Sequence, residues 1–108
     1  MMLRKGNNIK VYNLLKEITL EFKDDAKLLE LYLNVSIKLN KQKKAESLIL
    51  NLLGMRYKKE EMLIKLGLLK NQQKKYEQAR ILFFKAIEIS RNSIIAWLGL
   101  GKACSNLG

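Results

Sequence analysis

Residues 63–89, LIKLGLLKNQQKKYEQARILFFKAIEI, decide the fold, because apolar side chains recur there at helical spacing on both sides of a polar turn. Small residues such as Gly67 and Ala79 let two helices approach closely, and large ones such as Leu63 and Phe83 fill the gaps around them. The segment therefore predicts a closely packed pair of helices.

The same pattern recurs along the chain with a period of about 34 residues, which is the mark of a repeat protein. Leu29, Leu63 and Trp97 are equivalent positions in three successive periods, and Gly67 and Gly101 are equivalent in two. Three further columns hold apolar residues in all three copies: Val11, Ala45 and Ala79; Leu15, Ile49 and Phe83; and Ile18, Leu52 and Ala86. One helical pair leaves a face uncovered, so stacked pairs would bury a continuous core.

The unit resembles the tetratricopeptide repeat, whose pattern is W-x2-L-G-x2-Y on a first helix and A-x3-F on a second, usually with a terminal proline. The middle copy carries the pattern best, with Leu63, Leu66, Gly67, Tyr76, Ala79, Phe83 and Ala86. The last copy matches W-x2-L-G with Trp97, Leu100 and Gly101, whereas the 26–59 copy has Leu29, Tyr32 and Leu33 there. The proline is missing, and its columns hold Lys23, Tyr57 and Arg91.

The resemblance implies an all-α fold: a right-handed solenoid of helical hairpins with six helices, forming a single domain over residues 1–108. It places the second half of a repeat at 6–25, full repeats at 26–59 and 60–93, and the first half of another at 94–108. We expect helices at 8–22, 26–39, 42–54, 60–72, 76–89 and 94–107. Acidic or capping residues precede or open three of them, as helix termini favour: Asp24 and Asp25, Glu60 and Glu61, and Asn92 and Ser93.

Catalytic and metal chemistry has little support in the sequence. The chain has no histidine and one cysteine, which rules out histidine-based triads and thiolate metal sites. The stretch GLGKACS, residues 99–105, lacks the glycines and the Ser or Thr that phosphate-binding motifs require. Cys104 falls on an apolar stripe, so we expect a buried structural thiol. We therefore predict no enzyme activity, no cofactor and no metal.

The formal net charge of +11 favours acidic partners, although the lysines are spread through the chain as expected of a gene with AT-rich composition. No apolar run reaches the roughly 20 residues that a membrane helix needs, and the start is no secretory signal. A single cysteine fits a reducing compartment. The expected protein is soluble and cytoplasmic.

The family resemblance implies that a partner peptide or amphipathic helix, with some acidic side chains, binds a concave groove lined by the first helix of each repeat. From 26–39 the groove residues would be Lys27, Glu30, Leu31, Asn34 and Lys38. From 60–72 they would be Glu61, Ile64, Lys65, Leu68, Asn71 and Gln72, and from 94–107 Ile95, Leu98, Gly99, Lys102 and Asn106. Of the carboxylate clamp of chaperone adaptors only Asn34 is present. The competing interpretation makes these leucines core residues.

A nucleic-acid surface is the less favoured alternative. Turn lysines recur in successive repeats and could follow a phosphate backbone: Lys41, Lys43 and Lys44, and then Lys74 and Lys75. No aromatic residues are interleaved with them to stack bases, and arginine is scarce.

Self-assembly is another alternative, because the predicted array starts and stops in half repeats. Trp97, Leu100, Cys104 and Leu107 form an apolar stripe, and each large side chain left in water would forgo about 1.5–3 kcal/mol. Either the chain is a fragment of a longer array or an assembly covers the stripe. Gly6 and Gly108 share a repeat column, so the last helix of one chain and the first of another, with Val11 and Leu15, would make one composite unit.

Overall fold

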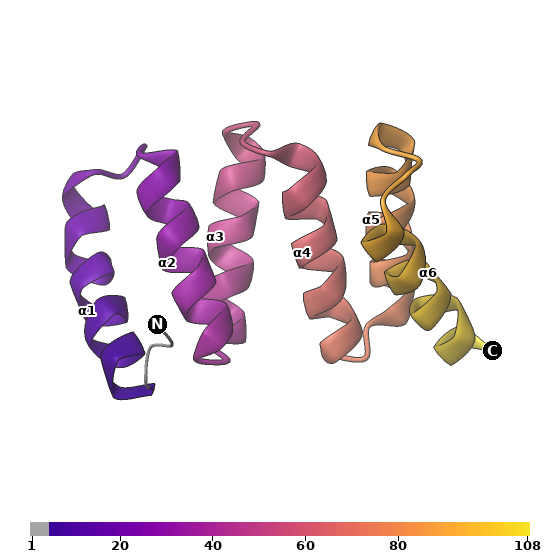
Figure 1. Ribbon diagram of the computed structural model, residues 1–108, viewed down its shortest axis with the longest axis horizontal. Helices are drawn as coiled ribbons and strands as arrows, with labels where there is room; N and C mark the ends of the chain where they lie inside the picture. The colour runs from indigo at the N-terminus through magenta and orange to yellow at the C-terminus, as the bar shows by residue number, and fades with distance from the viewer. Residues whose placement is uncertain (1–4) are drawn as a thin grey trace. The chain divides into compact units, whose positions relative to one another are not determined.

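The computed structural model describes residues 5–108 (Figure 1), so residues 1–4 of the predicted domain lie outside the described part. Every regular element along 5–108 is a helix, which confirms the all-α prediction. The six helices are α1 (Lys5–Glu21), α2 (Ala26–Lys38), α3 (Gln42–Gly54), α4 (Lys59–Gln72), α5 (Tyr76–Ile89) and α6 (Ile94–Leu107). The bounds of α3, α5 and α6 are those predicted, and α2 and α4 differ by one residue at one end. Helix α1 was predicted at 8–22, but it already includes Lys5 and ends one residue earlier, at Glu21.

The chain divides into two compact units. The first ends at Met55 and contains α1, α2 and α3, with α2 in contact with both of its neighbours. The second, Arg56–Gly108, contains α4, α5 and α6, and all three helices contact one another. Between α3 and α4, Arg56 and Lys58 have left-handed backbones, with φ of 57° and 45°. Each unit is described below by itself.

Helix starts follow the capping residues that the sequence predicts. The Asp25 carboxylate accepts the N–H of Leu28 at 3.2 Å, and the Ser93 hydroxyl accepts the N–H of Ala96 at 3.3 Å. Both bonds satisfy amides that a helix N-terminus leaves without a partner. Glu60 lies in the first turn of α4, where the helix dipole favours an acid.

The turn between α2 and α3 and the turn between α4 and α5 lie one repeat period apart and have the same backbone conformation. Asn40 and Lys74, which follow α2 and α4 and share a repeat column, are both left-handed, with φ of 58° and 62°. The next residues, Lys41 and Lys75, each donate their N–H to the carbonyl five residues earlier, at 2.8 and 2.9 Å. This bonding closes a helix C-terminus and redirects the chain. At this turn the backbone therefore has the same conformation one sequence period apart.

The cores contain the repeated apolar columns. Fully buried large side chains include Tyr32, Leu33, Ile49 and Leu52 in the first unit, and Met62 and Phe83 in the second. Ala79 and Ala86 are wholly buried in α5, as their columns predict. Their equivalents in α1, Val11 and Ile18, are only half-buried.

The ring of Phe83 on α5 lies between two glycines, one on each neighbouring helix. A Cβ added to Gly67 on α4 would come within 2.8 Å of the ring, and one added to Gly99 on α6 within 2.3 Å. The close approach of both helices to α5 therefore depends on these glycines. Gly101 shares the repeat column of Gly67, which predicts the same close packing, but Gly101 is exposed and a Cβ there would meet nothing within 4 Å. Its face of α6 is not the face that contacts α5.

Candidate binding pocket on α4 and α6

An open pocket of about 380 Å³ lies between α4 and α6 in the second unit. Its walls are formed by side chains at helical spacing on each helix, because residues three and four apart share one face. The lining residues are Leu68, Asn71, Gln72, Ile95, Leu98, Gly99 and Lys102. All seven belong to the groove predicted from the sequence, so the structure brings this part of the predicted groove together.

The pocket presents large apolar side chains to solvent. Leu68 is 42% exposed, Ile95 57% and Leu98 69%, so the interpretation that places these leucines in the core is wrong. Covering a leucine or isoleucine completely is worth about 1.5–3 kcal/mol, and these side chains have not gained all of it. The pocket wall can therefore gain stability from an apolar occupant.

Asn71 has a structural role that its sequence position did not indicate. Its side chain is only 5% exposed, and Nδ2 donates to the backbone oxygen of Gly99 at 3.2 Å. A carbonyl can only accept, so this bond fixes which end of the amide faces α6. Asn71 therefore ties α4 to α6 at the floor of the pocket. Helical periodicity showed its face, but only the packed structure shows the backbone oxygen opposite it.

The charge at the pocket is positive. Lys102 is exposed at its edge, and none of the lining residues within 5–108 is acidic. Further along α4, the ammonium of Lys65 lies 3.9 Å from a carboxylate oxygen of Glu61, one turn away. Acidic ligands would meet a cation here without competing with a lining carboxylate.

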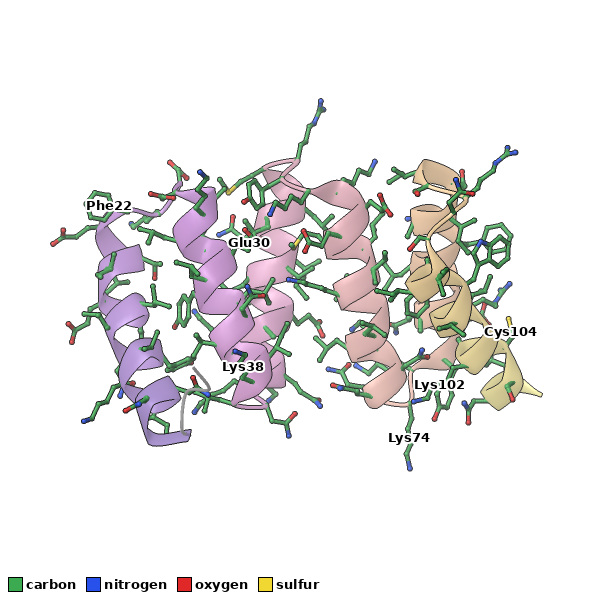
Figure 2. The ribbon with its side chains drawn as sticks, viewed as in Figure 1. Phe22, Glu30, Lys38, Lys74, Lys102 and Cys104 are labelled. Carbon is green, nitrogen blue, oxygen red and sulfur yellow. The ribbon has the colours of Figure 1, made fainter. Side chains whose placement is uncertain are left out.

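The remaining predicted groove residues do not line this pocket. Ile64 and Lys65 are half-buried on α4, and Glu61 and Asn106 are exposed. In the first unit the predicted residues lie on α2, where Glu30 and Lys38 are labelled in Figure 2. Exposed members of that set are Lys27, Leu31, Asn34 and Lys38, and Glu30 is half-buried.

A second, smaller pocket, which the sequence reasoning missed, lies between α4 and α5. It has a volume of about 190 Å³ and is lined by Lys59, Leu63, Lys85, Glu88 and Ile89. The start of α4 and the end of α5 therefore lie side by side. Leu63 is 5% exposed, and the pocket rim is charged.

The turn lysines of the first unit contact aromatic rings. The Lys41 ammonium lies 5.1 Å from the centre of the Tyr12 ring, and that of Lys44 lies 5.0 Å from the centre of the Tyr32 ring. The two rings pack edge to face, with their centres 5.2 Å apart. Burial of the Tyr32 hydroxyl and, after it, the adjacent Tyr12 phenol raise the pKa of Tyr32. These cation–π contacts give two of the lysines a structural role.

The other three turn lysines, Lys43, Lys74 and Lys75, are exposed. Lys74 extends away from its turn in Figure 2. The two lysine groups belong to different units, and each is available to solvent on its own unit.

Three predictions about the apolar stripes need correction. Leu100 is 9% exposed and Leu15 is 7% exposed, so neither is available to another chain. Cys104 is exposed instead of buried, because the face of α6 that packs inward carries Ala96, Gly99, Leu100 and Ala103. Trp97 is 52% exposed, and its Nε1 donates to the Arg91 carbonyl at 2.8 Å.

Along the described helices, none is long and apolar enough to cross a membrane. Within residues 5–108 no three His, Cys, Asp or Glu side chains come together in a way that could hold a metal ion.

Comparison with known proteins adds no relative. No protein-family model matches the chain. No curated protein matches it either. The tetratricopeptide resemblance therefore rests on the residues of this sequence.

Proposed function

We propose that this chain is a non-catalytic scaffold of the tetratricopeptide type, which binds a segment of another protein in the pocket between α4 and α6. The observation that carries the proposal is the pocket itself, where Leu68, Ile95 and Leu98 are exposed around about 380 Å³ of open space. Apolar burial contributes about 25 cal/mol per Å² and would drive binding.

The recurrence of one turn supports the solenoid part of the proposal. Asn40 and Lys74, one repeat period apart, share their left-handed conformation and the bonding around it. The aromatic of A-x3-F, Phe83, packs on the glycine of the preceding helix, Gly67, as close helix packing requires. Sequence period, turn geometry and core packing favour the same repeat.

The lining favours an apolar segment that also carries acidic side chains. Lys102 supplies a positive edge, and the net charge of +11 attracts acidic partners at long range. A carboxylate clamp is not part of the proposal, because Ile95 and Gly99 stand where that clamp has lysine and arginine. The expected occupant is an amphipathic helix or an extended segment held mainly by its apolar side chains.

A peptide library displayed on phage tests the proposal without a known partner. Peptides selected on the wild-type chain would be synthesised and their dissociation constants measured against Leu68→Glu and Ile81→Glu. The two sites are matched, since Leu68 is 42% exposed in the pocket and Ile81 is 46% exposed on α5 outside it. Placing a carboxylate in an apolar contact should weaken binding about tenfold or more for Leu68→Glu alone.

Equal binding by both variants would contradict the pocket as the binding site. Failure to select any peptide richer in apolar and acidic residues than the starting library would contradict the partner chemistry. Circular dichroism of each variant verifies that both remain helical.

A further inference from the structure

Two helix faces in this chain are open where their repeat equivalents are covered. The open face of α6 carries Trp97, Gly101 and Cys104, all exposed. One repeat period earlier, on α4, the equivalents Leu63, Gly67 and Lys70 are all buried. Gly67 packs against Phe83 of α5, whereas a Cβ on Gly101 would meet nothing within 4 Å. Among residues 5–108, no helix covers this face of α6 as α5 covers the equivalent face of α4.

The second open face lies on α1 and carries Val11, Leu14 and Ile18. Leu14 is 56% exposed, and the other two side chains are half-buried. Their equivalents in α5, two repeat periods later, are Ala79, Leu82 and Ala86; the two alanines are fully buried and Leu82 is half-buried. The difference follows from the neighbours, because α5 contacts both α4 and α6 but α1, within residues 5–108, contacts only α2.

The two open faces are complementary in the repeat. The residues of the α6 face are the repeat equivalents of the α4 residues that pack against α5. The residues of the α1 face are the repeat equivalents of the α5 residues that become buried when α5 packs against α4. We propose that α1 of a second copy docks on the open face of α6, in the arrangement that α5 adopts on α4. Because the two surfaces differ, each copy has one of each, and the contact can continue from copy to copy or close on itself.

Charge favours a second copy over an unrelated occupant. The segment 17–25 holds four of the ten acidic residues of this basic chain and one lysine, a net charge of −3. The end of α5 lies beside the start of α4 in the pocket that contains Lys59 and Glu88. The same arrangement would place Glu17 and Glu21 beside the start of α6, close to the exposed Arg91 and the positive end of the helix dipole.

Disulfide trapping tests the contact directly, because Cys104 is the only cysteine and is exposed. Cys104 corresponds to Lys70, and Val11 corresponds to Ala79, on the two sides of the α4–α5 turn. Val11→Cys should therefore form a disulfide with Cys104 of another copy under mild oxidation, giving species of two or more chains on a non-reducing gel. Asn13→Cys, exposed on α1 outside the open face, is the control for random collision.

The association itself is measured on the native chain by analytical ultracentrifugation at about 0.15 M salt, where the repulsion between copies of charge +11 is screened within about 8 Å. We expect the mass to rise with concentration and the emission of Trp97, the only tryptophan, to shift to the blue in parallel. Leu14→Glu should weaken association about tenfold or more, whereas Leu50→Glu, at a site 53% exposed on α3, should leave it unchanged.

Three outcomes would overturn the proposal. One is a native chain that stays monomeric, with Trp97 emission constant, up to hundreds of micromolar. Another is equal crosslinking of Val11→Cys and Asn13→Cys, which would reflect random collision. The third is equal loss of association in Leu14→Glu and Leu50→Glu. Peptide binding in the α4–α6 pocket is measured separately, so its failure and the failure of this contact are distinguishable.

Discussion

Replacing Gly99 by alanine should destabilise the second unit, although alanine is the better helix former. The change favours the helix by about 1 kcal/mol when nothing opposes it. At this site the new Cβ would lie 2.3, 2.4 and 2.7 Å from three atoms of the Phe83 ring, far inside van der Waals contact. Overpacking of a core costs about 1–3 kcal/mol, so the net effect is a loss of up to about 2 kcal/mol.

Gly101 provides an internal control two residues further along the same helix. No atom lies within 4 Å of a Cβ built there, so Gly101→Ala should gain the full helical preference of about 1 kcal/mol. The two variants differ only in which face of α6 receives the methyl group. The stability difference between them, about 1–3 kcal/mol, isolates the contact with Phe83.

Urea unfolding at low micromolar concentration measures both variants, with circular dichroism for helix content and Trp97 fluorescence as the local probe of α6. A double-mutant cycle with Phe83→Leu tests the mechanism, because the smaller side chain leaves room for the methyl group. Phe83→Leu should therefore cost less stability beside Gly99→Ala than in the wild type. Equal stabilisation by Gly99→Ala and Gly101→Ala would refute the packing of Phe83 against α6.

Substitutions at four further positions test local features of the fold. Lys74→Gly should raise stability by about 0.5–1 kcal/mol in thermal unfolding, since φ is 62° there, and Asn40→Gly should raise it less because asparagine tolerates this conformation. Ser93→Ala should cost about 1 kcal/mol through loss of the cap on Ala96, while Ser93→Asp should retain most of it. Asn71→Asp should cost about 1–3 kcal/mol at pH 7, because a carboxylate replaces the donor to the Gly99 carbonyl, and less at pH 4, where a protonated acid donates again. If Asn71→Asp lost the same stability relative to the wild type at pH 7 and at pH 4, the hydrogen bond from Asn71 to Gly99 would not be the cause.

Much of the fold follows from short-range pattern. Helices α3, α5 and α6 begin and end at the predicted residues, and Ser93 caps the start of α6. Leu68 and Leu98, which helical spacing places on an open face, are exposed at the pocket. Errors arose where a residue's neighbour is distant in sequence: Leu100 was expected on an open stripe but packs inward, and Cys104 was expected inside but is exposed.

The six helices, the caps Asp25 and Ser93, and the repeat period follow from the amino-acid sequence alone, because they depend on backbone preferences and on apolar spacing within a few turns. Which glycine is essential to packing depends instead on contacts between helices. Gly99 and Gly101 differ by two residues, about 200° around a helix, and it is the position of Phe83 that covers one and leaves the other open. The same contact turns one face of α6 toward α5 and leaves Trp97 and Cys104 on the surface where we expect a second copy to bind.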